Sequence, residues 1–418
     1  MARCILLFAA VWLLGGCSST VRLMPTPTLF TSDPGLFAAG KDEVADTTIE
    51  ILYATNRLPI GPANARYYTR VRSNQLRLGV ATLRVGDGTT SWEALEAMST
   101  SVVEGERPKI TLASTREVAV LDDGTGRPGA DDEAFFDEVD ALLQRVANRD
   151  LVIYVHGANT DFDRAAAQAA QFQHFLGRDA VVMVFAWPSA GTLLRYGRDV
   201  MTARRSEPSF AHLLQQLAAH TQAANVNVLA YSAGAMIASP GLARAAGDAE
   251  AAGESGRLRL GEIYYAAPDI DFPLFVENLP RYQGQVRRVT GAINLSDRAL
   301  SFAQWMHRVS RAGRPNLADI DPAQTRWLVD ASGRDELDVL SIRPDELPGL
   351  PASSHSFWYD HPWVSSDILL KLLFHAPPAA RGLSPNSTEF ELAFWTFPAD
   401  YAERLPTVAR ALKAGRSP

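Results

Sequence analysis

The sequence predicts an α/β protein in which helices flank a mostly parallel central sheet, with a strand-rich extension on its N-terminal side. Three observations lead to this fold class. Short apolar runs such as 151–155 and 225–229 are typical of buried parallel strands. Between such runs lie segments with apolar residues at helical spacing, for example 162–176. Residues 47–121 are instead rich in strand-like segments, which indicates an antiparallel extension of the sheet.

Strands are expected where β-branched and apolar residues alternate or form short runs, and helices where apolar residues recur every three or four positions. Strands are therefore expected at 47–55, 76–85, 109–121, 151–155, 181–187, 225–229, 262–267, 286–295, 327–331 and, as an edge strand, 389–397. Helices are expected at 133–147, 162–176, 209–223, 233–245, 298–311, 363–375 and 401–414. This alternation gives a mostly parallel sheet covered on both faces.

Length and composition fit one large domain with additions. The 418 residues are 47% hydrophobic, which is ample for a large core. The net charge of −7 and the lack of a long Lys/Arg run exclude nucleic acid as the expected partner. We expect the main domain to span 46–380 and a C-terminal extension to span 381–418.

The first residues predict a targeting segment. Arg3 is followed by an apolar run over 5–14, and Leu14-Gly15-Gly16 precedes Cys17. This ending resembles the lipobox of bacterial lipoproteins, in which the cysteine receives a diacylglycerol and the chain is cut before it. The resemblance implies a signal peptide over 1–16 and a lipid anchor on Cys17. The alternatives are an ordinary secretory signal or a short membrane anchor.

Residues 17–45 contain Thr, Pro and Ser, so we expect a tether between lipid and domain. By analogy, Ser18 in place of Asp favours the periplasmic face of the outer membrane in a bacterial envelope. The only cysteines are Cys4 and Cys17, so the mature domain has no disulfide, thiolate nucleophile or cysteine metal site.

Residues 225–237 carry the main chemical signal. The strand-like run ends at Tyr231, Ser232 follows, and small residues lead into a helix. A strand that turns sharply into a helix at a serine is a nucleophile elbow, which exposes the hydroxyl above the sheet. Ala230 and Gly234 supply the small side chains that the close approach of strand and helix requires. The usual pattern has Gly at both positions, so this elbow is a variant.

Val155-His156-Gly157-Ala158-Asn159 ends another expected strand, at the edge where α/β sheets bind ligands. Acyl transfer needs two N–H donors for the developing oxyanion. We expect one donor from Ala158 or Asn159 and the other from Ala233. We interpret His156 as a scaffold residue under this loop.

An acid and a histidine are needed later in the chain. Asp297 closes the strand at 286–295 and opens a helix, where it also suits an N-cap. The rival acids are Asp269 and Asp271, which follow the strand at 262–267, and Asp330.

His355 lies in a loop among small residues and is free to reach the elbow, whereas His375 falls in or at the end of a helix; His361 is a further neighbour. The order Ser232, Asp297, His355 fits the α/β-hydrolases. In this interpretation His355 shuttles the serine proton, and Asp297 fixes its tautomer.

Residues 47–375 are similar to a family of bacterial α/β-hydrolases of unknown function within the esterase/lipase superfamily. Seven ordered segments carry this resemblance, at 53–57, 155–160, 185–191, 229–234, 266–271, 296–300 and 355–357. Tyr231 stands where the family commonly has His, and Ala233 where it commonly has Met. A larger residue is frequent at the position of Ala158. The resemblance implies an α/β-hydrolase fold and a serine hydrolase, without naming a substrate.

Three further residues have open interpretations. Trp187 is either a pocket wall or a core residue beside a rigid turn. Arg57 and Arg298 are candidates for binding an acidic substrate group, although paired surface arginines are more usual.

The sequence therefore predicts a membrane-tethered serine hydrolase, most simply a carboxylic ester hydrolase acting on a small-molecule or lipid ester. No cofactor or metal is expected, because no ligand set or phosphate-binding Gly loop is present. The alternative is a catalytically silent hydrolase fold with a binding or structural role in the envelope. Acyl transfer or peptide hydrolysis by the same residues is left open.

Overall fold

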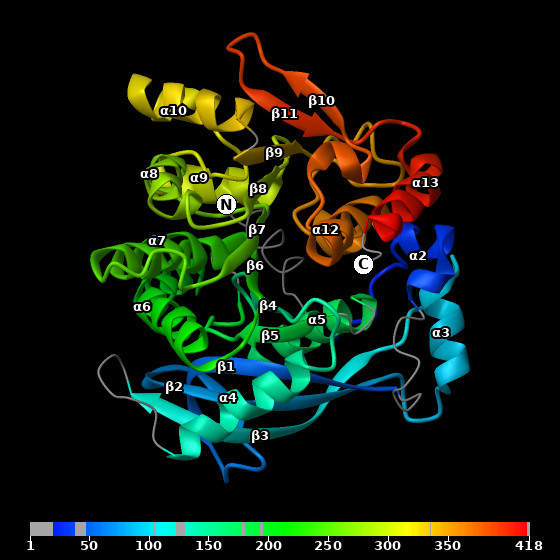
Figure 1. The fold of residues 1–418 in the computed structure, drawn as a ribbon, viewed down its shortest axis with the longest axis vertical. Coiled ribbons are helices and arrows are strands. Elements are labelled where there is room, and N and C mark those ends of the chain that lie inside the picture. The colour runs from blue at the N-terminus through cyan, green and yellow to red at the C-terminus, as the bar shows by residue number, and fades with distance from the viewer. Residues whose placement is uncertain are drawn as a thin grey trace, which may run out of the picture.

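A single mixed sheet organises the molecule. The computed structural model describes residues 20–37, 47–102, 105–122, 130–176, 180–192, 195–334 and 336–415. Its strands are β1 (Thr48–Ile60), β2 (Tyr67–Val85), β3 (Ile110–Asp122), β4 (Asp150–Val155), β5 (Val181–Phe185), β6 (Asn225–Tyr231), β7 (Leu260–Ala266), β8 (Arg288–Ile293), β9 (Leu337–Ser341), β10 (Ser384–Ser387) and β11 (Ala393–Thr396). Among these residues they form one sheet in the order β10-β11-β9-β8-β7-β6-β4-β5-β1-β2-β3 (Figure 1).

The strands from β11 to β1 in this order pair in parallel, and β2, β3 and β10 add antiparallel edges. Every residue of β4, β5 and β7 is buried, because helices cover both faces of these strands. The predicted fold class, with its N-terminal antiparallel extension, is confirmed.

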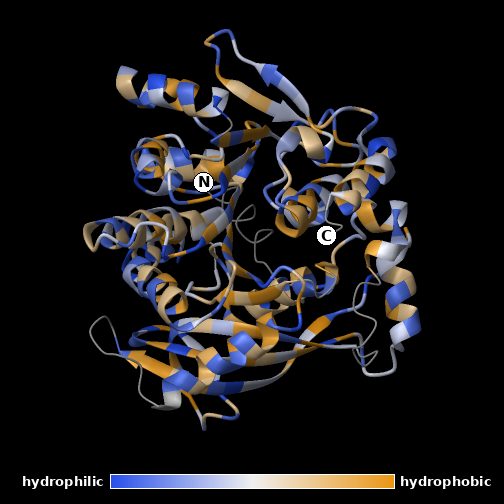
Figure 2. Cartoon of the chain, viewed as in Figure 1, coloured by the Kyte–Doolittle hydropathy of each residue, from blue (hydrophilic) through white to orange (hydrophobic). Residues whose placement is uncertain are grey.

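The helices separate into two layers (Figure 1). They are α2 (Thr28–Ser32), α3 (Trp92–Thr100), α4 (Ala130–Leu143), α5 (Phe162–Phe175), α6 (Tyr196–His220), α7 (Ala235–Ala251), α8 (Phe272–Gln283), α9 (Arg298–His307), α10 (Pro322–Gly333), α11 (Phe357–Asp360), α12 (Pro362–Phe374) and α13 (Tyr401–Ala414). One apolar core contains side chains of α6, α7 and α8, and the other contains side chains of α5, α12 and α13. Hydrophobic and hydrophilic residues alternate around surface helices such as α10 (Figure 2).

The strand expected at 327–331 is wrong, because these residues lie within α10. The Asp321 side chain accepts hydrogen bonds from the backbone N–H groups of Ala323 and Gln324, and Gln324 completes a capping box. This cap fixes a helix start that outweighs the local apolar run around Trp327. The neighbouring strand in the sheet is β9, which was not expected.

The described part of the predicted tether packs against the domain. Leu23, Leu29 and Phe30 are buried, and the N–H of Leu29 donates to the Ser366 hydroxyl on α12. Residues 20–37 are therefore not a free linker, because they carry apolar side chains that complete the second core. Cys17 and the predicted signal over 1–16 lie outside the described residues.

Within the described parts of the chain, no helix has both the length and the apolar character that a membrane span requires.

Candidate active site

The connection from β6 to α7 is a tight turn with Ser232 at its apex. Ser232 has a φ of 51°, a left-handed conformation that is costly for a residue with a side chain. A short 3-10 turn over Ser232–Gly234 leads into α7. A serine in such backbone between strand and helix has the geometry of a nucleophile elbow.

Small residues allow the turn to form. A Cβ at Gly234 would lie 2.3 Å from the carbonyl oxygen of Val155, so only glycine fits there. Ala230 is fully buried and pairs with Val155 across the sheet, where its methyl group is accommodated. The Ala-x-Ser-x-Gly variant is therefore compatible with a close crossing of α7 over β4.

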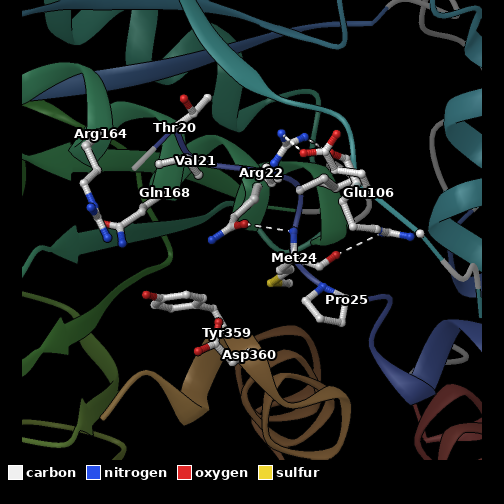
Figure 3. Close-up of a pocket in the computed structure, with 14 residues that line it drawn as sticks. Thr20, Val21, Arg22, Met24, Pro25, Glu106, Arg164, Gln168, Tyr359 and Asp360 are labelled. Carbon is white, nitrogen blue, oxygen red and sulfur yellow. Dashed lines mark hydrogen bonds and ion pairs between the residues drawn. The ribbon is translucent and has the colours of Figure 1, made fainter. Parts of the chain in front are cut away.

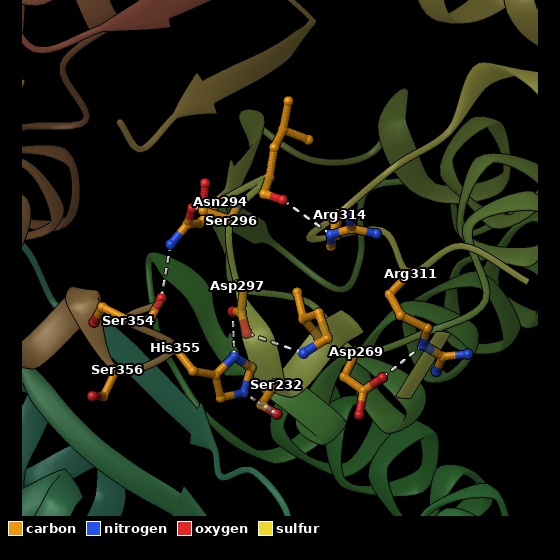
Figure 4. Close-up of polar contacts among 12 residues, drawn as sticks. Ser232, Asp269, Asn294, Ser296, Asp297, Arg311, Arg314, Ser354, His355 and Ser356 are labelled. Atoms are coloured by element: carbon orange, nitrogen blue, oxygen red, sulfur yellow. Dashed lines mark hydrogen bonds and ion pairs between the residues drawn. The ribbon is translucent and has the colours of Figure 1, made fainter. Parts of the chain in front are cut away.

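Three side chains from separate elements form a continuous hydrogen-bonded series. Ser232 Oγ lies 2.8 Å from His355 Nε2, and His355 Nδ1 lies 2.6 Å from Asp297 Oδ2 (Figure 4). Because Asp297 accepts the Nδ1 proton, Nε2 of a neutral His355 is left to accept the serine proton. Asp297 is fully buried, whereas the His355 side chain is 20% exposed.

Asp297 also begins a helix. Its Oδ1 accepts the N–H of Leu300 at 3.0 Å as the N-cap of α9, while Oδ2 binds His355. The capping bond orients the carboxylate, so the two roles expected from the sequence are compatible.

The loop that carries His355 is held by a residue to which the sequence assigned no role. The side-chain amide of Asn294, just after β8, donates to the carbonyl of Ser354 at 2.9 Å (Figure 4). The rings of Tyr231 and Trp358 pack around the loop, with Tyr231 5.3 Å from His355. Asn294 lies three residues before Asp297 in the sequence, and this proximity is the signal that points to it.

The rival acids make other contacts. Asp269 Oδ1 binds the buried Arg311 at 2.6 Å, and Asp271 also binds Arg311. The N–H of Asp269 donates to the carbonyl of Ser232 at 3.0 Å, which ties its loop to the elbow. Asp330 is exposed on α10. Among the described contacts, the carboxylate that meets His355 is that of Asp297.

The rival histidines also lie elsewhere. His361 caps α12 by accepting the N–H of Trp363, and burial lowers its pKa. His375 Nε2 lies 3.0 Å from Asp150, the first residue of β4, and so occupies the opposite edge of the sheet from Ser232.

The loop after β4 carries the predicted oxyanion donors. Gly157 approaches the elbow so closely that a Cβ there would lie 3.1 Å from Ser232 Cβ. The N–H of Asn159 is donated to Asp199 Oδ2 at 3.2 Å, which leaves Ala158 as the stronger candidate on this loop. Ala233 directly follows the serine and is fully buried.

Asp199, in α6, shapes this loop and was not recognised from the sequence. Besides Asn159, it accepts the N–H of Ala190 at 2.6 Å and the Ser189 hydroxyl at 2.8 Å. Burial raises the pKa of the Asp199 carboxyl above its usual value, and the hydrogen bonds from Ala190, Ser189 and Asn159 only partly oppose this rise.

Arg57 is buried beneath the same loop. It donates to the carbonyls of Thr160 at 2.9 Å and Trp187 at 2.6 Å. Burial lowers its pKa to about 10, so it stays charged at neutral pH. Arg57 is therefore neither a surface arginine nor a ligand for an acidic substrate group, the two interpretations that the sequence left open. Arg298, in contrast, is exposed.

His156 is a buried scaffold residue, as interpreted from the sequence. Its ring stacks on Trp187, whose indole N–H donates to the His156 carbonyl at 2.7 Å. Burial, reinforced by the charge of Arg57, lowers the pKa of His156 to about 3. Trp187 is fully buried, in agreement with the core interpretation.

Within the described ranges, no three His, Cys, Asp or Glu side chains gather in an arrangement that could hold a metal ion.

Comparison with known proteins agrees with the fold. A model of the family "Alpha/beta hydrolase of unknown function (DUF900)" matches residues 131–347. The match covers more than half of the chain and includes Ser232 and Asp297, and His355 lies just beyond its end. No curated protein matches the chain. The chain belongs to this family of α/β-hydrolases of unknown function.

Proposed function

We propose that this protein is a serine hydrolase that cleaves carboxylic esters, with Ser232 as nucleophile, His355 as general base and Asp297 as its orienting acid. The observation that carries the proposal is the unbroken hydrogen-bonded series from Ser232 Oγ through His355 to the buried carboxylate of Asp297. A serine hydroxyl is a weak nucleophile until an adjacent base accepts its proton, and this series supplies that base.

In the first half-reaction, Ser232 Oγ attacks the ester carbonyl carbon while His355 Nε2 takes the hydroxyl proton. The negative oxygen of the tetrahedral intermediate accepts hydrogen bonds from the backbone N–H groups of Ala158 and Ala233. The loss of one such donor costs about 3 kcal/mol of transition-state stabilisation. The intermediate collapses as the bond from carbon to the leaving oxygen breaks, and His355 gives its proton to the departing alcohol.

In the second half-reaction, water attacks the acyl-Ser232 ester, and His355 takes a proton from the water. Collapse of this second intermediate returns the proton to Ser232 Oγ and releases the carboxylic acid. Throughout, Asp297 stabilises the imidazolium without itself taking the proton.

We further propose that the protein is tethered to the bacterial cell envelope, at the periplasmic face of the outer membrane. Cleavage before Cys17 and attachment of a diacylglycerol to its thiol supply the anchor. Metabolic labelling with an alkyne-bearing palmitate tests this: the full chain is expected to incorporate the label, and Cys17→Ala to lose it. Labelling that persists in Cys17→Ala contradicts the anchor.

The hydrolase proposal is tested with p-nitrophenyl esters of increasing acyl length and the chain lacking residues 1–19. Every contact described above lies within residues 20–415, so this deletion preserves them all. We expect ester hydrolysis by the wild type, loss of it in Ser232→Ala, and retention in the control Ser296→Ala, an exposed serine beside Asp297. Equal activity in Ser232→Ala contradicts the proposal.

A further inference from the structure

Helix α9 exposes a group of large apolar side chains. Trp305 is 75% exposed and Phe302 is 52% exposed, and Met306 on the same helix is 39% exposed. Leu295, which is 58% exposed, precedes the helix by three residues. The opposite side of the helix is buried through Leu300 and Ala303. We call Leu295, Phe302, Trp305 and Met306 the α9 apolar face. The rings of Phe302 and Trp305 lie 5.9 Å apart, so these side chains form a group, and such a group marks an interaction surface rather than scattered surface residues.

The α9 apolar face belongs to the edge of the sheet that holds Ser232. Helix α9 begins at Asp297, the residue that binds His355. After the helix the chain returns to the same edge, where Gly313 accepts the N–H of Asn294 at 3.1 Å and donates to Pro268 at 2.8 Å. The backbone of Leu295 is also held by Arg314 at 3.0 Å. Both ends of the α9 segment are thus fixed beside the candidate active site.

The exposed charges within the α9 segment are positive, and the nearest exposed carboxylate, Asp319, accepts the N–H of Ser310 just beyond it. Residues 295–309 contain Arg298 and Arg308, both exposed, and their only carboxylate is the buried Asp297. Neither arginine forms an ion pair with any residue in the described ranges. This contrasts with the net charge of −7 of the whole chain. Exposed Trp and Phe flanked by arginine suit the surface of an anionic bilayer, where the rings enter the interface and the guanidinium groups meet lipid headgroups.

The described chain also begins at this edge. Thr20 lines a cavity of about 460 Å³ together with Arg164, Tyr359 and Asp360 (Figure 3). The ring of Tyr359 lies 6.2 Å from that of Tyr231, the neighbour of Ser232. The first described residue therefore lies on the side of the molecule that carries the candidate active site, and the proposed lipid-bearing Cys17 precedes it by three residues in the sequence.

We infer that the α9 apolar face docks on an anionic lipid bilayer and holds the Ser232 edge of the sheet against the membrane. The substrates that fit this orientation are esters carried in the bilayer, such as acyl lipids. The substrate part of the inference rests on the hydrolase function proposed above; the docking itself does not.

The test is co-sedimentation of the chain lacking residues 1–19 with vesicles of phosphatidylcholine alone or with one-third phosphatidylglycerol. We expect the wild type to bind the anionic vesicles, and Phe302→Ser/Trp305→Ser to weaken binding about tenfold. Arg298→Gln/Arg308→Gln is expected to weaken binding to anionic vesicles only, as added salt does. Circular dichroism and thermal melts verify that each variant is folded.

A matched control comes from β1 and β2, where Ile60 and Tyr67 are 58% and 62% exposed. Ile60→Ser/Tyr67→Ser removes a similar apolar area and is expected to bind vesicles like the wild type. The inference is overturned if the wild type does not bind the anionic vesicles, or if Phe302→Ser/Trp305→Ser binds them as well as the wild type. It is also overturned if only Ile60→Ser/Tyr67→Ser loses vesicle binding. If the wild type does not bind vesicles but associates with itself, and Phe302→Ser/Trp305→Ser abolishes this association, the α9 apolar face binds a second copy of the chain instead of a bilayer. Because binding is measured by sedimentation, an inactive protein that binds refutes only the hydrolase proposal.

Discussion

At the scale of single residues, the site depends on side chains that each satisfy two demands. Asp297 caps α9 with one carboxylate oxygen and orients His355 with the other. Ser232 accepts a left-handed backbone, which the close packing of Gly234 against β4 maintains. These paired contacts fix the rotamers of the reacting groups before any substrate binds.

Asp297→Asn tests the acid. The amide cannot accept the Nδ1 proton in the same way, so His355 is expected to adopt the wrong tautomer and kcat on a p-nitrophenyl ester to fall roughly 10⁴-fold. Asp330→Asn, at an exposed position of α10, serves as the control and is expected to leave kcat unchanged. A folded Asp297→Asn enzyme with undiminished kcat contradicts the assignment.

His156 predicts a pH dependence of stability. Its pKa is about 3 in the folded chain, against about 6.5 when unfolded. Between these values the unfolded chain binds more protons, so the free energy of unfolding falls as the pH drops, by up to about 1.4 kcal/mol per pH unit from this residue.

Urea unfolding between pH 6.5 and 4.5 measures this slope. The slope is expected to be shallower in His156→Gln than in the wild type, because the variant has no group to protonate. Parallel slopes in the two proteins would show that the His156 pKa is not depressed.

At the scale of elements, the crossing of α7 over β4 brings the elbow and the oxyanion loop together. Gly234 lies where the two backbones meet, since a Cβ there would lie 2.3 Å and 2.9 Å from the carbonyl oxygens of Val155 and His156. The spacing between these elements is therefore set by the absence of one side chain.

A pair of Gly→Ala substitutions tests this packing. Gly234→Ala places a methyl 2.3 Å from the Val155 carbonyl oxygen, so we expect a loss of more than about 2 kcal/mol in the free energy of unfolding. Gly247 lies in α7, and a Cβ there would have no other atom within 4 Å. Gly247→Ala is therefore expected to be neutral or stabilising by up to about 1 kcal/mol. Similar effects of the two substitutions in thermal melts contradict the account of the elbow.

The sequence predicts elements well where one signal dominates. The buried strands β4 and β5 follow from their apolar runs, and α13 from its spacing. The prediction at 209–223 covers only the part of α6 after Pro208, and no helix is predicted over α8. Proline inside a helix does not by itself hide the pattern, because α13 contains Pro406 and is predicted. The short apolar run around Trp327 predicts a strand, whereas the capping box at Asp321 starts a helix that contains it.

The residues of the site also differ in how well the sequence predicts them. Ser232, Asp297 and His355 carry local motif signals, and their order along the chain suggests how they meet. Arg57 binds Trp187, 130 residues away, and Asp199 binds Asn159, 40 residues away, and no local pattern contains such contacts. Their roles become visible only when the strand ends are brought together.

At the scale of the whole molecule, the N-terminal segment is part of the structure. Phe30 is fully buried and stacks on Phe175 of α5 at 5.7 Å, and Lys413 of α13 binds Asp33 at 2.8 Å. The beginning and end of the described chain are thereby joined on one face of the sheet. Thr and Pro around these residues suggested a linker, but composition does not report which few apolar side chains find a core.

Phe30→Ala is expected to lower the free energy of unfolding by about 3–5 kcal/mol, because it opens a cavity in a core shared by α2, α5 and α12. The control is Phe390→Ala, since Phe390 is 62% exposed and its removal is expected to change stability by less than about 0.5 kcal/mol. Equal urea midpoints for the two variants contradict the packed N-terminal segment.

The central claim is that Ser232 is an activated nucleophile, and a fluorophosphonate probe tests it most directly. The chain lacking residues 1–19 is expected to be labelled on Ser232, as located by peptide mass spectrometry, with labelling lost in Ser232→Ala and strongly reduced in His355→Ala. A folded wild-type chain that resists the probe, or labelling that survives Ser232→Ala, contradicts the claim; the first result favours a silent scaffold, and the second a nucleophile elsewhere in the chain.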